Sequence, residues 1–312
     1  MERGMNKVVL VTRRTRLEEL VRKYNTAEQA RFYMEHLGAD FSDYIREDER
    51  YQKAVSVVVQ AAEKYARLQR IDRDFLPNMI FGPKDIVIAL GQDGLVANIL
   101  KYLDGQPLIG VNPDPARWDG ILLPFEAGET EQILLKVLGG NNGIREITMA
   151  QAGTRDGQTM LAVNDLFIGQ RTHVSARYDI AWNSRRESQS SSGIIVSTGL
   201  GSSGWYRSVM AQAAGIAESF GGRRFESRGL RWEERALAFV VREPFPSRQT
   251  QAGIVYGRLT GKDTFRILSR MPENGVVFSD GMESDAIEFN AGTEITVGIA
   301  PKRGMLVTNA VS

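Results

Sequence analysis

The chain has 312 residues, of which 42% are hydrophobic and 25% are charged, and its formal net charge is +1. This composition is typical of an ordinary globular protein, and the charge gives no electrostatic reason to expect nucleic acid or an anionic membrane as a partner. Because there is no cysteine and there are only 2 histidines, any catalysis must depend on carboxylates, hydroxyls, amides, lysine and arginine.

The first apolar segment, KVVLVT at residues 7–12, predicts a buried strand. It begins so close to Met1 that it leaves no room for a signal or transit peptide. No apolar run reaches the roughly 18 residues that are needed to cross a bilayer. We therefore expect a cytoplasmic protein without a membrane partner.

Predicted helices and strands alternate over the first part of the chain, as judged from the spacing of apolar residues. Helices are predicted over 16–37 with a break at Asn25, over 47–66, around 77–81 and over 95–103. Strands are predicted over 67–72, 85–90 and 107–111. This alternation predicts an open parallel sheet that is covered on both faces.

After about residue 125 the pattern changes. A helix over 129–138 is followed by short β-rich segments between turn clusters, which predict an antiparallel meander or sandwich, with one more helix over 203–219. We expect an α/β domain at 1–125 and a β-rich domain at 126–312, whose last segment can pack back on the first domain. The cleft between two domains is the default binding site.

The first motif is Gly91-Gln92-Asp93-Gly94, which lies between a predicted strand and a predicted helix. Such a turn exposes backbone N–H groups and a helix N-terminus to an anion, and ligands of open α/β sheets bind at the carboxyl ends of strands. A plain turn explains the same four residues equally well, because short glycine motifs are common.

The second motif is the pair Asn164-Asp165, which interrupts the hydrophobic run of a predicted strand over 159–169. A bulge or a satisfied buried amide is one explanation. Recognition of hydroxyls or of an adenine edge is the other, because a buried carboxylate–amide pair needs hydrogen-bonding partners.

The third motif is rich in glycine and serine, with SSSG at 190–193 and GLGSSGW at 199–205 flanking the apolar segment IIVST. A strand that feeds such a turn and then a helix supplies N–H and hydroxyl donors for an anion or a ribose. A flexible loop with a helix cap is the alternative.

In this order and spacing, the three motifs resemble those of the NAD kinase family, which has a GGDGT loop, an asparagine–glutamate pair and a serine/threonine-rich turn. The segments PLIGVNPDP (107–115), VNDLFIG (163–169) and VREP (241–244) are most similar to the mitochondrial-type branch. The resemblance implies an α/β domain, a β-rich domain and a nucleotide cleft between them. It also implies a homodimer or a larger homo-oligomer.

The resemblance implies that Asp93 is the catalytic aspartate, which helps to remove the proton from the 2′-hydroxyl of the adenosine ribose of NAD. Asn164 and Asp165 fall on the pair that holds the dinucleotide, with Asp in place of Glu. The other positions that match the dinucleotide-lining stretch are Ser203, Gly204, Trp205 and Ser208. For Trp205, a role as a core aromatic is an equally good explanation.

Two residues depart from the phosphate loop of the family, since Gln92 replaces a glycine and Leu95 replaces a threonine. A side chain at position 92 would collide with a phosphate if its φ angle were positive or if its Cα lay against the ligand. It could instead turn away, or its amide could donate to the donor phosphates. Arg13 and Arg14 follow the first strand and are candidates for holding the donor phosphates, with a plain solvated turn as the alternative. The arginine-rich segment 221–235 either folds over a phosphate or is a solvated loop.

The implied function is a kinase that uses ATP or polyphosphate and Mg²⁺ to phosphorylate NAD, with no protein side chain assigned to the metal. One alternative is a weakened relative that binds NAD or NADP as a sensor, for which Gln92 and Leu95 are the evidence. Another is a kinase of the same fold with a lipid or sugar-like acceptor. The sequence leaves open the phosphoryl donor, the choice between NAD and NADH, and any regulatory ligand.

Overall fold

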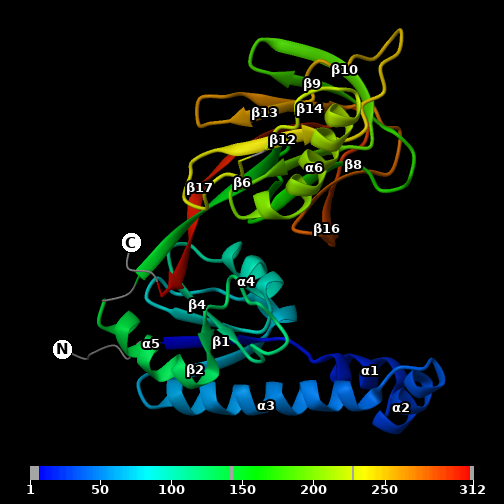
Figure 1. The fold of residues 1–312 in the computed structure, drawn as a ribbon. Helices are drawn as coiled ribbons and strands as arrows, with labels where there is room; N and C mark the ends of the chain where they lie inside the picture. Colours follow the sequence, from blue (N-terminus) through cyan, green and yellow to red (C-terminus); the bar gives the residue numbers. More distant parts are fainter. Residues whose placement is uncertain (1–6, 141–142, 227, 310–312) are drawn as a thin grey trace. The chain divides into compact units, whose positions relative to one another are not determined.

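The structure is a computed structural model that describes residues 7–140, 143–226 and 228–309 (Figure 1). It consists of two compact units, Met1–Arg145 with Gly304–Ser312, and Glu146–Arg303. The chain passes from the first to the second within β6 (Gly143–Thr154) and returns within β17 (Glu294–Thr308). The boundary at residue 125 expected from the sequence thus falls inside the first unit, because α5 (Thr130–Leu138) packs in the core of that unit.

The first unit contains a parallel sheet in the strand order β2-β1-β3-β4. The strands are β1 (Lys7–Thr12), β2 (Arg67–Asp72), β3 (Ile86–Leu90) and β4 (Pro107–Asn112). The short β5 (Phe125–Glu126) and the end of β17 also pair with β4 in parallel. β3 is buried at every position, which explains why its sequence IVIAL does not alternate with polar residues.

Some helices of the first unit begin at a polar side chain that caps them, whereas others begin without such a cap. They are α1 (Arg16–Tyr24), α2 (Ala27–His36), α3 (Phe41–Glu63), α4 (Asp93–Leu100), α5 and the 3₁₀ helices η1 (Arg73–Asn78) and η2 (Ala127–Glu129). The predicted break is confirmed, since Asn25 has a φ of 69° and Thr26 caps the next helix by accepting from the N–H of Gln29. α3 begins before the expected residue 47, because Asp40 accepts from the N–H of Ser42 at its start.

The second unit is built from antiparallel strands. One sheet has the order β13-β12-β11-β8-β15-β16, and another group has the order β10-β9-β14-β17. The strands are β6, β7 (Thr159–Ala162), β8 (Asp165–Gln170), β9 (Ala176–Trp182), β10 (Arg185–Ser191), β11 (Ile194–Ser197), β12 (Leu237–Val241), β13 (Tyr256–Leu259), β14 (Phe265–Ser269), β15 (Gly275–Ser279), β16 (Met282–Glu288) and the first part of β17. The strand predicted over 159–169 is therefore two strands, β7 and β8, with a break at residues 163 and 164.

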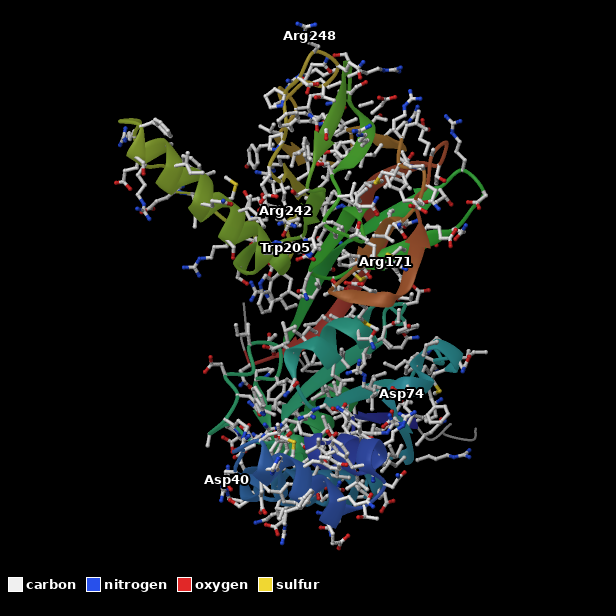
Figure 2. All side chains as sticks on the ribbon, turned by 90° about the vertical axis from the view of Figure 1, so that its right-hand side faces the viewer. Asp40, Asp74, Arg171, Trp205, Arg242 and Arg248 are labelled. Carbon is white, nitrogen blue, oxygen red and sulfur yellow. The ribbon has the colours of Figure 1, made fainter. Side chains whose placement is uncertain are left out.

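The one long helix described in the second unit is α6 (Trp205–Ser219), which projects with Trp205 at its start in Figure 2. Tyr206 on α6 packs with Phe167, Ile195 and Ala238 of the six-stranded sheet. The helix predicted over 203–219 is thus present, except that residues 201–203 form the 3₁₀ helix η3.

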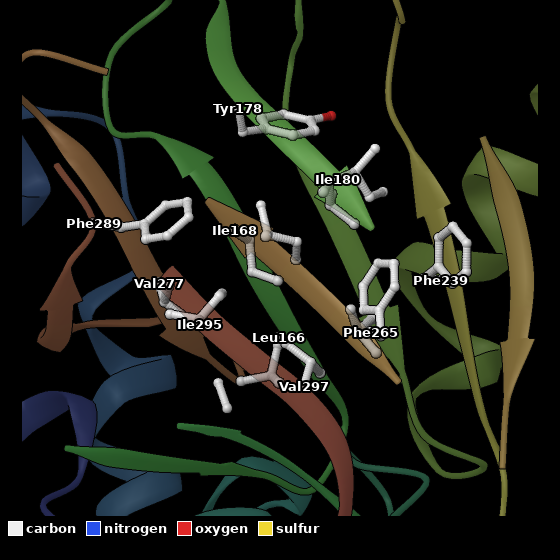
Figure 3. Packing of buried hydrophobic residues seen from close by; sticks show 14 of the residues in the cluster. Leu166, Ile168, Tyr178, Ile180, Phe239, Phe265, Val277, Phe289, Ile295 and Val297 are labelled. Carbon is white, nitrogen blue, oxygen red and sulfur yellow. The ribbon is translucent and has the colours of Figure 1, made fainter. Parts of the chain in front are cut away.

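The main core of the second unit lies between the two groups of strands (Figure 3). Leu166 and Ile168 of β8 meet Ile180 of β9, Phe265 of β14 and Ile295 of β17. The residues that face the opposite way on β9, β14 and β17 include charged side chains, which gives the alternation expected of a sheet with one exposed face. Among the described residues of the whole chain, no helix is long and apolar enough to span a bilayer.

Candidate functional site

The first unit has a topological switch point between β1 and β3. These two strands are neighbours, but the chain continues from β1 to β2 on one side and from β3 to β4 on the other. The Tyr51 hydroxyl bridges the carboxyl ends of the two strands, because it donates to the Leu90 carbonyl (3.0 Å) and accepts from the Arg13 N–H (2.9 Å). Burial raises the pKa of Tyr51 to about 12, which keeps this donor protonated. Open α/β sheets bind ligands at such an opening.

The predicted phosphate loop follows β3 at this switch point. Gln92 precedes α4 with φ −129° and ψ 164°, an extended conformation that any residue adopts, and its side chain makes no capping hydrogen bond. The collision expected for a positive φ at this position therefore does not arise. Gly94 lies in the first turn of α4, with open space where a Cβ would be. The N-terminus of α4 is thus accessible to an anion.

Asp93 is the first residue of α4, and the loop after β4 fixes its side chain. Its Oδ1 accepts a hydrogen bond from the N–H of Leu122 at 2.8 Å. That loop can lie on β4 only because residue 110 is glycine, since a Cβ there would stand 2.0 Å from the Leu122 carbonyl oxygen. Within the described part of the chain, no hydrogen bond is recorded for Oδ2 of Asp93. One carboxylate oxygen is therefore held and the other is left for a ligand.

Leu95, the second departure from the family pattern, is buried and 3% exposed. Its Cδ2 lies 2.9 Å from the position that a Cβ on Gly91 would occupy. A side chain at position 91 would therefore press against Leu95, whose end would have to shift to make room. Leu95, which stands where the family has threonine, therefore packs inside the first unit and offers no hydroxyl to a ligand.

Arg13 and Arg14 lie at the carboxyl end of β1, as the sequence predicts, but each is paired with a carboxylate. The Arg13 side chain is 11% exposed, and its guanidinium lies 3.2 Å from Glu47 and 5.4 Å from the centre of the Tyr51 ring. Arg14 forms an exposed ion pair with Asp74 at 2.7 Å. Both arginines are therefore engaged within the first unit.

A network of charges extends from Glu47, and the sequence analysis did not identify it. Arg16 pairs with both Glu47 and Asp43, and Arg117 pairs with Asp43. Arg117 and then Arg16 hold the pKa of Asp43 well below its usual range. The network connects α1, α3 and the loop after β4, so it fixes the loop that carries Leu122.

The second unit presents the Asn164-Asp165 pair at the break between β7 and β8. The carboxylate of Asp280 accepts hydrogen bonds from three consecutive N–H groups, those of Val163 (3.1 Å), Asn164 (2.7 Å) and Asp165 (3.3 Å). Asp280 (φ 54°) and Gly281 (φ 73°) form the two-residue turn between β15 and β16. This Asp-Gly turn therefore closes a β-hairpin, and it also supports the candidate site.

Asp165 is the first residue of β8 and is 9% exposed. Burial, followed by the negative charge of Asp280, raises the pKa of Asp165 to about 6. No hydrogen bond is recorded for its carboxylate among the described residues, whereas the Asp280 carboxylate accepts three. Asp165 is therefore the carboxylate of this pair that is available to a ligand.

The third motif holds the second in place. Thr198 donates from Oγ1 to the Val163 carbonyl (2.5 Å) and from its N–H to the Asn164 carbonyl (2.9 Å). Gly201 approaches so closely that a Cβ would lie 2.0 Å from the Asn164 carbonyl oxygen. The two motifs, separated in the sequence, are thus brought together within the second unit.

The remaining predicted residues lie at the start of α6. Ser203 donates to the Leu200 carbonyl (3.4 Å) and Ser208 to the Gly204 carbonyl (3.5 Å). The Trp205 ring stacks on Phe167 with 5.6 Å between centroids and 7° between planes. The guanidinium of Arg242 lies 5.2 Å from the Trp205 ring centre (Figure 2). Trp205 therefore has a packing role in the structure.

The structure thus gathers the predicted residues into two groups, one in each unit. Gly91, Gln92, Asp93 and Gly94 lie at the switch point of the first unit, near Arg13. Asn164 and Asp165 lie beside the third motif in the second unit. Within the described ranges, no group of three or more His, Cys, Asp or Glu residues is arranged to hold a metal ion.

Comparisons with known proteins agree with this architecture. No protein-family model matches the chain. The NAD kinase of Saccharolobus solfataricus is 29% identical over 121 residues, which cover 39% of this chain and about half (46%) of that relative. Yeast NADH kinase, solved with NADH, superposes with a TM-score of 0.63 at 13% identity, covering 99% of this chain and 85% of the other. An Archaeoglobus fulgidus NAD kinase, solved with ATP, superposes with a TM-score of 0.55 at 15% identity. The match covers 98% of this chain and 94% of the archaeal one.

In fold, the chain is a two-domain α/β protein with a mixed parallel sheet and an antiparallel sheet, as in the solved NAD kinases. The resemblance to the NAD kinase family that the three motifs predict is confirmed.

Proposed function

We propose that the protein is a kinase that transfers the γ-phosphoryl group of ATP to the 2′-hydroxyl of the adenosine ribose of NAD, giving NADP. The position of Asp93 is the observation that carries this proposal. Asp93 lies at the switch point, its Oδ1 accepts from the N–H of Leu122, and no partner is found for its Oδ2 among the described residues. The similarity to an archaeal NAD kinase and to the fold of NAD and NADH kinases supports it.

In this proposal, Asp93 accepts the proton of the attacking hydroxyl through Oδ2. Phosphoryl transfer has a loose transition state, so positioning and neutralisation of charge provide most of the catalysis. The N-terminus of α4 offers N–H groups to the donor phosphates. Mg²⁺ prefers phosphate, carboxylate and water oxygens, so the phosphates of ATP would hold the ion, which would neutralise their charge.

The second unit supplies recognition of the dinucleotide. The amide of Asn164 and the carboxylate of Asp165 offer a donor and acceptors to ribose hydroxyls or to the adenine edge. The hydroxyls of Ser203 and Ser208 lie on the adjacent stretch, where each donates only at 3.4 or 3.5 Å to a carbonyl and can turn to a ligand.

Gln92 is compatible with this function, because its extended backbone places no strain on the loop. Its side chain makes no capping bond, so its amide is a further donor for the phosphates of ATP or polyphosphate. On the resemblance alone, we also propose a homodimer or a larger homo-oligomer, which light scattering of the purified chain tests.

The experiment that tests the function measures NADP formed from NAD with Mg²⁺ and either ATP or polyphosphate, together with NAD binding by calorimetry. We expect turnover with ATP. Binding of NAD without turnover from either donor would contradict the kinase and favour a sensor. Absence of NAD binding would contradict NAD as the acceptor.

A further inference from the structure

The outer face of β9, β10 and β14 forms a concave surface with a cavity of about 700 Å³. These strands lie side by side in the second unit (Figure 1). Arg186 of β10 and Arg266 of β14 are both paired in register with Ala181 of β9, so the two arginines flank one small residue in a single row. With strands about 4.8 Å apart, their backbones are roughly 10 Å apart, a gap that two long side chains can close above Ala181.

The acidic groups on this surface already have partners. Asp179 accepts from Arg270 Nε (2.9 Å) and from the Ser188 hydroxyl (2.7 Å). Glu294 accepts from Arg155 (2.9 Å), and Glu187 accepts from the N–H of Ile254 (2.9 Å). Asp179 and Glu294 are therefore paired with arginines, and the carboxylate of Glu187 is held by backbone N–H groups.

The arginines in the row have no such partners. In the part of the chain that the structure describes, no hydrogen bond or ion pair is found for the guanidinium of Arg186 or of Arg266, and the same holds for the guanidinium of Arg177 on the same face of β9. The amide of Gln251 lines the same cavity and uses its oxygen to accept from the Ser188 N–H. Its nitrogen is left as a further donor.

We propose that this surface binds a small anion that carries phosphate groups, at a site that is separate from the residues of the proposed reaction. Each guanidinium presents a planar fork of donors, and a carboxylate with two oxygens satisfies only one such fork. A phosphate has enough oxygens, arranged tetrahedrally, to accept from two forks at once. The row of Arg186 and Arg266 with alanine between them therefore matches phosphate.

The test uses the full chain and inorganic triphosphate at physiological ionic strength, with affinity measured by calorimetry. We expect the double variant Arg186→Gln/Arg266→Gln to bind about tenfold or more weakly than wild type, because each guanidinium contributes charge-assisted hydrogen bonds. The matched control is Arg171→Gln/Arg248→Gln, which removes two exposed arginines elsewhere in the same unit (Figure 2). We expect the control to bind as wild type does.

A second pair of variants tests the position of the site. Ala181→Glu places a carboxylate between the two guanidiniums and should abolish the binding, whereas Ala181→Ser should retain it. The side-chain Nε–H NMR signals of Arg186 and Arg266, assigned from the glutamine variants, should shift on titration. Circular dichroism confirms that each variant is folded.

The proposal is overturned if the double variant binds triphosphate as wild type does, or if the control loses as much affinity, since binding then follows net charge alone. It is also overturned if the two arginine signals do not move. The same titration with ADP distinguishes a nucleotide from an inorganic ligand, according to which binds more tightly. None of these readouts depends on NAD phosphorylation, so failure here leaves the proposed kinase untouched.

Discussion

Asp165 and Asp280 are neighbouring carboxylates of the second unit whose surroundings differ. Asp280 accepts three backbone N–H bonds, whereas burial and the charge of Asp280 raise the pKa of Asp165 to about 6 from 3.8. The folded protein therefore holds a proton on Asp165 that the unfolded chain releases between these two values. The raised pKa of Asp165 therefore makes the free energy of unfolding depend on pH. The protonated carboxyl contributes its full stabilisation below about pH 3.8, and this stabilisation is lost as the pH rises to about 6.

We predict that Asp165→Asn removes this pH dependence. Relative to wild type, the variant should gain free energy of unfolding between pH 4 and pH 7, on the order of 2 kcal/mol, as measured by urea unfolding at each pH. Asp280→Asn is the control, because the amide oxygen still accepts from the three N–H groups while the charge is removed. In this variant, the pH at which half of the Asp165 effect is lost should be lower than in wild type. An unchanged midpoint would contradict the contribution of Asp280 and leave burial as the cause of the raised pKa.

Gln92 is the residue that most clearly departs from the family motif, and its φ of −129° predicts how it tolerates substitution. Gln92→Gly relieves no strain and increases the freedom of the unfolded chain, so we expect a loss of about 0.5–1 kcal/mol of unfolding free energy. Urea unfolding of Gln92→Gly and of wild type measures this difference in unfolding free energy. A variant more stable than wild type would mean that the loop is strained by the glutamine.

At the scale of elements, the second and third motifs are held together by close backbone approach. The turn after β11 can rest on the β7–β8 break only where residue 201 lacks a Cβ. The carbonyls of residues 163 and 164 are then satisfied by Thr198. Element packing, and not side-chain chemistry alone, therefore orients Asn164 and Asp165.

We predict that Gly201→Ala weakens NAD binding and destabilises the protein by about 1–3 kcal/mol, the usual cost of overpacking. Gly215→Ala in α6 is the matched control, because nothing lies within 4 Å of its Cβ position. This change should stabilise the helix by up to about 1 kcal/mol and leave binding unchanged. Equal effects of the two substitutions on thermal unfolding and NAD calorimetry would contradict the role of Gly201.

Across the whole molecule, the parts that the sequence predicts well are those with a local signal. Unbroken apolar runs such as IVIAL predict the buried parallel sheet, and alternating segments predict the β-rich unit. The glycine motif at 91–94 predicts where Asp93 lies because it follows a strand. The pair Asn164-Asp165 is expected inside one strand and lies at the break between two. The helix start at Phe41 differs from the predicted one because the Asp40 cap, and not the apolar periodicity, determines it. The start at Asp93 differs by two residues although no side chain caps that helix.

The contacts that the sequence does not predict join residues far apart in the chain. Asp280 supports the N–H groups of residues 163–165, and Arg117 reaches Asp43. Nothing local in a hairpin turn or in a proline-rich loop distinguishes these side chains from solvated ones. The row formed by Arg186 and Arg266 depends likewise on strand register, which is visible only in the folded sheet.

The central claim is that Asp93 accepts the hydroxyl proton during transfer of phosphate to NAD. The most direct measurement is the rate of NADP formation by Asp93→Asn, with NAD affinity measured in parallel and Asp104→Asn, an exposed carboxylate near the start of β4, as control. We predict a fall of about 10²–10⁴-fold in kcat, with NAD still bound and the control at the wild-type rate. Turnover by Asp93→Asn at the wild-type rate would contradict the account.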